Sequence, residues 1–214
     1  VVEPMMTGPG GDLFALVWSA KEQKLYGLNA SGPAGSAASL QYFKERNLSE
    51  IPIHGIESVT VPGAVDGWIQ LLKRFGTISL GEALQPAIKY ASAGYPVSPI
   101  IASDWQSQIS KLQVNIYSAS TYLIDGKAPS KGEIFKNPNL AKTYKMLARD
   151  PDSFYKGQIA AKIVAFIQDK GGFVTLDDMK NFSAEWVEPI STNYRGYEVY
   201  ELPPNGQGLA ALQL

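Results

Sequence analysis

The turn Gly8-Pro9-Gly10-Gly11-Asp12 runs directly into the apolar stretch Leu13-Phe14-Ala15-Leu16-Val17-Trp18, and the two together decide the fold. A short polar loop then leads to a second run, Lys24-Leu25-Tyr26-Gly27-Leu28-Asn29. Two such runs joined by a short loop predict an antiparallel hairpin. The first run is apolar at consecutive positions, which predicts that both of its faces are covered. The glycine-rich loops at the ends of the hairpin fit either plain turns or the edge of a site that exposes backbone amides.

The middle of the chain predicts helices. Trp68, Leu71, Leu72 and Phe75 recur at helical spacing, and Gly76 follows as the expected stop. Ser79 and Glu82 have the spacing of a capping box, and the helix that they open is expected to kink or break at Pro86. Residues 113–137 lack clear periodicity and are expected to be mostly loop. Further helices are expected at 37–47, with Leu40 and Phe43 facing inward, at 99–112, from Pro138, at 158–170 and after Thr175.

A second hairpin is predicted near the end of the chain, where β-rich runs at 187–192 and 197–202 flank Asn193-Tyr194-Arg195-Gly196. The segment Pro204-Asn205-Gly206-Gln207-Gly208 then opens a final helix and fits either an anion site or a tight turn. A hairpin at each end and a helical middle predict an α+β fold. No internal repeat or low-complexity linker divides the chain, so residues 1–214 are expected to form a single domain.

Composition argues against several classes of function. The chain has 19 Lys and Arg against 20 Asp and Glu, and this balance gives no electrostatic case for binding nucleic acid or an anionic membrane. It has no cysteine, which excludes a thiol nucleophile and a cysteine zinc site. The one histidine, His54, lies in an irregular segment and is expected to be structural or solvent-facing. We therefore expect neither a metal nor a cofactor, and no apolar run approaches the length of a membrane span.

The ends of the chain suggest a fragment. Val1 stands where an initiating methionine would be, and Leu214 falls inside an expected helix, so truncation at both ends is expected. The composition predicts a soluble protein and leaves cytoplasmic and exported locations both open.

A series of segments recurs in a familiar order over nearly the whole chain. They are Val2-Glu3-Pro4-Met5-Met6-Thr7-Gly8-Pro9-Gly10-Gly11-Asp12, Val61-Pro62-Gly63 with Gly67-Trp68, Ala93-Gly94-Tyr95-Pro96-Val97-Ser98, Phe154-Tyr155-Lys156-Gly157-Gln158-Ile159-Ala160, Gly171-Gly172 with Thr175 and Asp178, Glu188-Pro189, Tyr194-Arg195-Gly196-Tyr197-Glu198-Val199-Tyr200 and Pro203-Pro204-Asn205-Gly206-Gln207-Gly208. The ordered set resembles the large subunit of γ-glutamyltranspeptidases, also called glutathione hydrolases, and residues 1–214 would be the front and middle of that subunit.

The resemblance implies an N-terminal-nucleophile hydrolase with a four-layer αββα sandwich. In that family one precursor, a zymogen, cuts itself into a large and a small subunit. The new N-terminal threonine of the small subunit attacks a γ-glutamyl amide and forms an acyl-enzyme, which water or an acceptor amine resolves. The partners implied are a small-molecule γ-glutamyl or related acyl amide and the small subunit from the same precursor, and a homo-oligomer of such heterodimers is compatible with it. No catalytic group is assigned to this segment.

The family's contribution from this region is an arginine that pairs with the α-carboxylate of the substrate. Family members read like L-D-G-R-E-T-A-P or L-N-G-S-G-R-A-P, whereas this chain reads Leu28-Asn29-Ala30-Ser31-Gly32-Pro33-Ala34-Gly35. Ser31 and Pro33 therefore occupy the two arginine positions, and neither side chain can clamp a carboxylate. By position, Asn29, Ser31 and Pro33 are the candidate substrate-binding residues.

Three hypotheses follow from this departure. The first is a γ-glutamyl hydrolase or transferase that holds the α-carboxylate in another way. The second is a relative acting on another acyl group, such as the glutaryl group of β-lactam acylases. The third is a non-catalytic member of the family. The first two predict self-cleavage and a new N-terminal Thr or Ser, and the third allows an uncut precursor.

Overall fold

The structure, a computed structural model, describes residues 1–214 and divides them into two compact units. One unit contains residues 1–7 and 78–151, and the other contains residues 8–77 and 152–214. Helices accompany one three-stranded and two two-stranded sheets, which agrees with the predicted α+β class. None of the helices combines the length and the apolar character that crossing a membrane requires.

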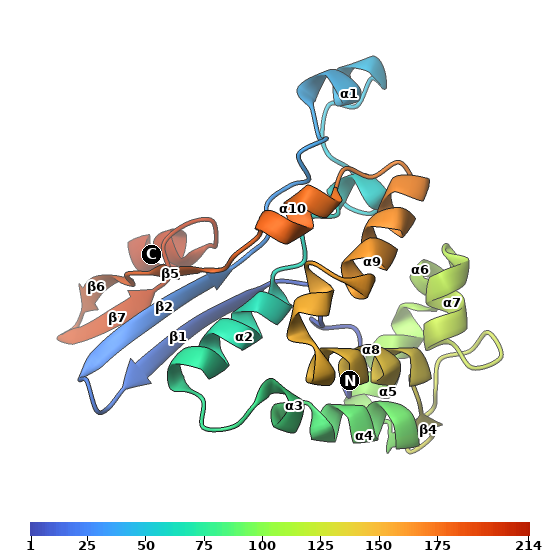
Figure 1. Cartoon of the computed structure of the whole chain (residues 1–214), viewed down its shortest axis with the longest axis horizontal. Helices are drawn as coiled ribbons and strands as arrows, with labels where there is room; N and C mark the ends of the chain where they lie inside the picture. Colours follow the sequence, from blue (N-terminus) through green and yellow to red (C-terminus); the bar gives the residue numbers. More distant parts are fainter. The chain divides into compact units, whose positions relative to one another are not determined.

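The larger unit is built on the predicted N-terminal hairpin (Figure 1). Strand β1 (Leu13–Ser19) pairs antiparallel with β2 (Lys24–Ala30), and β2 pairs antiparallel with the short strand β5 (Glu185–Val187). Helix α2 (Ala64–Phe75) lies along the hairpin, as Figure 1 shows. A Cβ at Gly67 would come within 2.9 Å of the Cβ of Ala30, so only glycine allows the helix to approach the sheet this closely. Leu28 and Ala30 are fully buried in the core that forms there.

The other face of the hairpin differs from the prediction. Phe14, Leu16 and Trp18 alternate with half-buried positions and are 45%, 39% and 57% exposed. Their regular alternation places them on one face of the sheet, opposite the face that α2 covers. The prediction that both faces are covered is therefore wrong for these 214 residues, because α2 covers only one of them.

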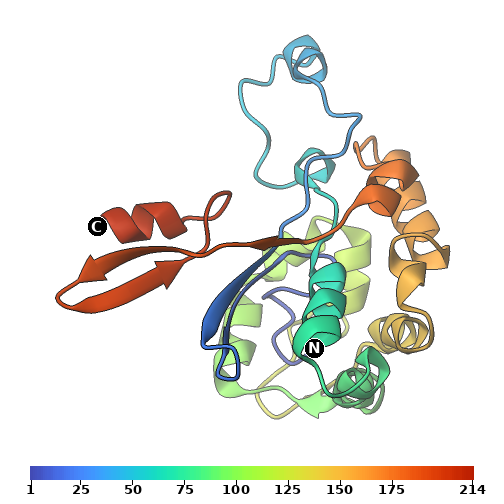
Figure 2. The same cartoon turned by 60° about the vertical axis from the view of Figure 1, so that its left-hand side comes forward.

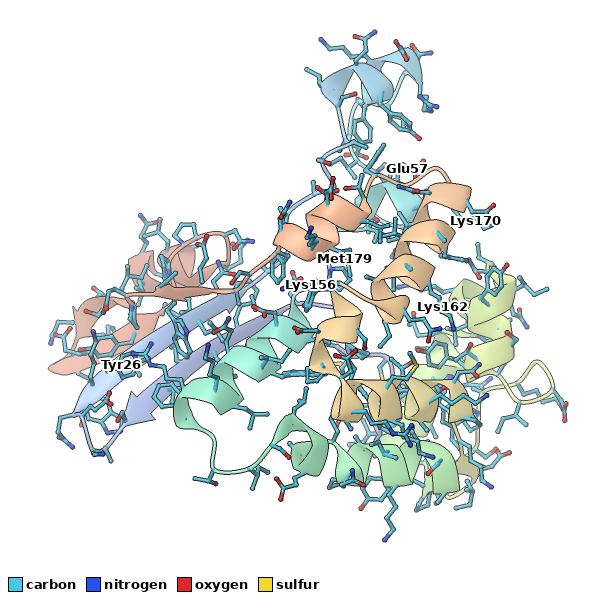
Figure 3. The ribbon with its side chains drawn as sticks, in the orientation of Figure 1. Tyr26, Glu57, Lys156, Lys162, Lys170 and Met179 are labelled. Carbon is cyan, nitrogen blue, oxygen red and sulfur yellow. The ribbon has the colours of Figure 1, made fainter.

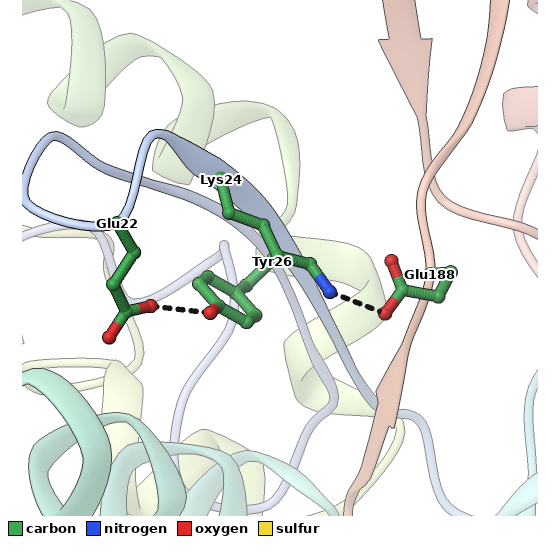
Figure 4. A network of polar contacts seen from close by, with 4 residues as sticks. All are labelled: Glu22, Lys24, Tyr26 and Glu188. Carbon is green, nitrogen blue, oxygen red and sulfur yellow. Dashed lines mark hydrogen bonds and ion pairs between the residues drawn. The ribbon is translucent and has the colours of Figure 1, made fainter.

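Side chains tie the outer end of the hairpin to the chain beyond β5 (Figure 4). The Nζ of Lys24 lies 2.9 Å from Oε1 of Glu188, and the hydroxyl of Tyr26 donates to Glu22. Behind Tyr26, the guanidinium of Arg74 lies 4.0 Å from the ring centroid. These contacts hold β2 against both α2 and the β5 segment.

The remaining elements of this unit agree well with the predicted ones (Figure 2). Met179, labelled in Figure 3, is fully buried and anchors α10. Leu40, predicted to face inward, is 69% exposed, because α1 is short and carries no buried residue. The elements are α1 (Leu40–Glu45), the 3₁₀ turns Ile56–Ser58 and Pro151–Phe154, α9 (Gln158–Asp169), α10 (Leu176–Asn181), the hairpin β6 (Ile190–Tyr194) and β7 (Tyr197–Glu201), and α11 (Gly208–Gln213).

The smaller unit is mostly helical. The aromatic rings of Trp105 and Phe135, 4.7 Å apart between centroids, form the centre of its core together with Tyr95 and Val97. The expected helix at 99–112 is broken at Gln108. Its elements are α3 (Leu80–Ala83), α4 (Gln85–Ala93), β3 (Tyr95–Pro96), α5 (Pro99–Ser107), α6 (Ile109–Gln113), α7 (Ile116–Tyr122), β4 (Ile134–Phe135) and α8 (Pro138–Arg149).

Residues 113–137 were expected to be mostly loop, and most of them lie outside helices and strands. The stretch also contains α7 and β4, which were not expected. None of the residues of α7 is buried, so the sequence of this helix needs no apolar stripe. The helix begins at a cap in which the Oδ1 of Asn115 accepts from the amide of Tyr117 at 2.8 Å. Strand β4 is two residues long and depends on pairing with β3.

Candidate functional site

A hollow of about 410 Å³ lies in the larger unit, where β2 ends and the chain turns away from the sheet. Its residues come from three separate stretches of sequence, namely the exit loop of β2, the connection between α10 and β5, and the turn after β7. They are Asn29, Ser31, Gly32, Pro33, Asn181, Phe182, Ser183, Glu185 and Asn205.

The exit loop of β2 is fixed by its backbone. The amide of Val61 donates to the carbonyl of Pro33 at 2.9 Å, and Ala34 forms an isolated antiparallel bridge with Thr60. A Cβ at Gly32 would lie 1.5 Å from the carbonyl oxygen of Val61, so the loop can follow this path only with glycine at that position. Ser31 and Pro33, the residues on either side of Gly32, are therefore held on a fixed backbone.

Asp12 comes directly before β1, beside the end of β2, and holds this loop. Its Oδ2 accepts from the hydroxyl of Ser31 at 2.9 Å, and its Oδ1 accepts from the amide of Gly32 at 3.2 Å. The glycine-rich turn that ends at Asp12 is also bonded to the start of α2. The carbonyl of Gly11 accepts hydrogen bonds from the amides of Gly63 and Ala64 at 3.0 and 2.8 Å. The turn therefore connects the hairpin to the start of α2 and places the carboxylate of Asp12 beside the exit loop.

Asn205 joins the C-terminal turn to the same loop. Its Nδ2 donates to Oγ of Ser31 at 2.9 Å, and its Oδ1 accepts from Nδ2 of Asn29 at 2.9 Å. Asn29 in turn accepts the amide of Ser31 on its Oδ1, at 2.9 Å. Ser31 is therefore held by three neighbours, and its hydroxyl both accepts from Asn205 and donates to Asp12.

A second layer supports the wall at residues 181–185. Oδ2 of Asp66 accepts from the amide of Ala184 at 2.7 Å. The buried hydroxyl of Tyr155 donates to the carbonyl of Pro62 at 2.8 Å and accepts from the amide of Asp66 at 3.0 Å, and burial raises the pKa of this phenol. The ring of Tyr155 stacks on Phe182 with centroids 5.7 Å apart. The wall is therefore held by α2 as well as by the sheet.

The polar character of the hollow is acidic. Glu185 lies opposite Asn29 in the β2–β5 ladder, so the two side chains point to the same face of the sheet. None of the lining residues is basic. Lys24, the nearest basic residue before the loop in sequence, pairs with Glu188 at the other end of β2. The structure contains no group of three His, Asp or Glu side chains suited to a metal ion.

All three candidates named from the sequence, Asn29, Ser31 and Pro33, line this hollow. Sequence reasoning did not find Asp12, Glu185 or Asn205. Asp12 and Asn205 do lie in segments that resemble the family, the glycine-rich turn at 8–12 and the turn at 203–208. Both segments also fitted plain turns, so neither residue was singled out. The exposed side chain of His54 is not among the residues that line the hollow.

The family model described as gamma-glutamyltranspeptidase matches residues 1–214. The glutathione hydrolase-like YwrD proenzyme of Bacillus subtilis (strain 168) is 40% identical over 214 residues, which cover 99% of this chain and 40% of that protein. The glutathione hydrolase proenzyme of the same organism is 32% identical over 218 residues, which cover 97% of this chain and 36% of that protein.

Solved structures agree with this result. The crystal structure of cephalosporin acylase from Bacillus halodurans superposes on this chain with a TM-score of 0.92 at 41% identity. The match covers 99% of this chain and 40% of the acylase chain. The chain shares the mixed helix-and-sheet fold of its structural relatives, which are N-terminal-nucleophile hydrolases, and this confirms the predicted fold class. The chain belongs to the gamma-glutamyltranspeptidase family, a family of enzymes, and spans about 40% of the length of its relative YwrD.

Proposed function

We propose that this chain is the substrate-binding front part of a γ-glutamyltranspeptidase-like amidohydrolase or acyltransferase that cleaves γ-glutamyl amides such as glutathione. The observation that carries the proposal is that Asn29, Ser31 and Pro33, placed by family position, line one rigid polar hollow. A hollow built on strand ends and backed by a second layer of hydrogen bonds is a favourable place to hold an acyl group for reaction.

The proposed chemistry proceeds through an acyl-enzyme. The hydroxyl oxygen of an N-terminal threonine, outside these 214 residues, attacks the amide carbonyl carbon while its own α-amine takes the hydroxyl proton. The carbon–nitrogen bond breaks, and the amine leaves with that proton. Water then adds to the ester carbonyl and returns a proton to the threonine, which releases the free acid, or an acceptor amine takes the acyl group instead. The role of this chain is to hold the acyl group in place.

The uncovered sheet face supports a partner from the same precursor. Phe14 lies opposite Asn29 in the ladder, so the exposed row of Phe14, Leu16 and Trp18 shares a face with the side chains of Asn29 and Glu185. An apolar row of this kind is a surface for packing against another layer. We infer that the small subunit covers this row and thereby brings its threonine next to the hollow. The relatives YwrD and the glutathione hydrolase of the same organism are both named proenzymes.

The second candidate is an acylase for another acyl group, of glutaryl or β-lactam type. One observation favours it, because the solved structure at 41% identity is that of a cephalosporin acylase. The absence of a basic residue from the lining of the hollow argues against an α-carboxylate and equally against the terminal carboxylate of a glutaryl group.

The test uses the full-length protein. Self-cleavage into two chains with a new N-terminal threonine, followed by release of p-nitroaniline from γ-glutamyl-p-nitroanilide and a mass increase of the small subunit by the acyl group, is the expected result. Release from a glutaryl amide alone would favour the second candidate. A precursor that stays uncut and hydrolyses neither amide would leave the non-catalytic hypothesis in place.

A further inference from the structure

We propose that the hollow at the end of β2 recognises an ammonium group on the acyl part of its substrate rather than a carboxylate, with Glu185 as the residue that determines this preference. The inference rests on the proposed function, because it assigns the substrate class of the same hollow.

The hollow is negatively charged. Glu185 contributes a carboxylate, Asp12 places a second one directly behind Ser31, and no lining residue is basic. Like charges repel and opposite charges attract at short range, more strongly near a protein than in bulk water. A substrate carboxylate placed here would be repelled, whereas an ammonium would be attracted.

Among the carboxylates beside the hollow, only that of Glu185 lacks a hydrogen-bond donor. The Oδ atoms of Asp12 already accept from Ser31 and Gly32, and the Oδ1 of Asn29 accepts from Ser31. Glu185 has no such side-chain partner, and its backbone is fixed by pairing with Asn29. An ammonium carries three donors and no acceptor, so it matches a carboxylate that has no hydrogen-bond donor of its own.

The backbone that carries Glu185 is rigid. Glu185 lies between Ala184, whose amide is bound by Asp66 at 2.7 Å, and Trp186, which packs on the core beneath β2. The carboxylate therefore extends from a fixed backbone, which lowers the entropy lost when it binds a ligand. A charged side chain on a strand pinned on both sides is suited to distinguish substrates by charge.

The experiment compares four p-nitroanilides that differ only at the far end of the acyl group. The 4-aminobutyryl compound keeps the ammonium alone, the glutaryl compound keeps the carboxylate alone, the γ-glutamyl compound has both, and the butyryl compound has neither. In the full-length processed protein, kcat/KM for the 4-aminobutyryl compound is expected to exceed that for the glutaryl compound by about tenfold.

Variants of Glu185 test its role. Glu185→Gln keeps the shape and should bring the ratio of the two kcat/KM values close to one, and Glu185→Lys should reverse the preference. Glu50→Gln is the matched control, because Glu50 is also an exposed glutamate but lines a different hollow beside α1, and this variant should leave the ratio unchanged.

The outcomes separate the two proposals. A preference for the glutaryl compound, or a ratio that Glu185→Gln does not move, overturns the ammonium proposal and leaves the proposed function intact. If none of the four compounds is hydrolysed, the proposed function fails, and calorimetric binding of 4-aminobutyrate against glutarate decides the ammonium proposal by itself. Tighter binding of glutarate would then overturn it.

Discussion

The amide nitrogen of the Asn205 side chain donates a hydrogen bond of 2.9 Å to the hydroxyl of Ser31, although the two residues are 174 positions apart in the chain. This bond and the one from Asn29 to Asn205 join the turn after β7 to the exit loop of β2. The hollow therefore owes one of its walls to a single exposed side chain.

Asn205→Ala should weaken substrate binding more than it weakens the fold. It removes two hydrogen bonds to the exit loop, each worth about 1 kcal/mol, so kcat/KM for the acyl substrate should fall roughly tenfold, mostly through KM. Steady-state kinetics measures this change. Asn139→Ala, at an exposed asparagine in the first turn of α8, is the control and should leave the kinetics unchanged. Equal effects of the two variants would contradict the assigned role of Asn205.

Gly32→Ala should disrupt the exit loop. The added Cβ would lie 1.5 Å from the carbonyl oxygen of Val61, so the loop must move and loses the bonds that Asp12 makes with it. We expect a loss of about 3 kcal/mol or more in the free energy of unfolding, measured by urea denaturation, together with loss of activity. Gly10→Ala is the matched control, because no atom lies within 4 Å of its added Cβ. A stable and active Gly32→Ala variant would show that the loop is not packed as described.

Two buried tyrosines should respond oppositely to loss of their hydroxyl groups. Tyr155→Phe leaves the carbonyl of Pro62 and the amide of Asp66 without that partner and should cost about 1–3 kcal/mol of unfolding free energy. The hydroxyl of Tyr95 is buried with no hydrogen-bond partner, so Tyr95→Phe should leave stability unchanged or raise it by up to ~1 kcal/mol. Urea denaturation of both variants measures the difference, and a larger loss in Tyr95→Phe than in Tyr155→Phe would contradict it.

The same tyrosines predict a loss of stability at alkaline pH. Burial raises the pKa of Tyr95 from 10.0 to about 12 and also raises the pKa values of Tyr122, Tyr144 and Tyr155. Above pH 10 the unfolded chain releases these protons before the folded chain does, so the free energy of unfolding falls as pH rises. The contribution of Tyr95 is fully present below pH 10 and is lost between pH 10 and about 12. Unfolding free energies measured at several pH values should show this decrease, and Tyr95→Phe should make it shallower.

The sequence by itself determined the elements whose pattern is local. The two apolar runs on either side of the polar loop 19–23 predicted the first hairpin, and the spacing of Trp68, Leu71, Leu72 and Phe75 predicted α2. The capping box at Ser79 forms as its spacing indicates, and Thr175 caps the short helix expected after it. These features could be predicted because periodicity and caps act between residues a few positions apart.

Other elements depend on distant partners and could not be predicted. Strand β5 is three residues long and exists through pairing with β2, more than 150 residues earlier in the chain. The exposure of Phe14, Leu16 and Trp18 depends on which elements cover the sheet. The apolar sequence of β1 alone does not reveal those elements. Helix α7 lacks an apolar stripe because it has no buried residue.

The candidate site shows the same division. Sequence position singled out Asn29, Ser31 and Pro33, because a family-like motif lies in one continuous stretch. Only the tertiary structure brought Asp12, Glu185 and Asn205 to them, through a hairpin, a strand ladder and a returning turn. Side-chain hydrogen bonds and local charge act over a few ångströms of space, whatever the separation along the chain, so the acidic character of the hollow was decided by the fold.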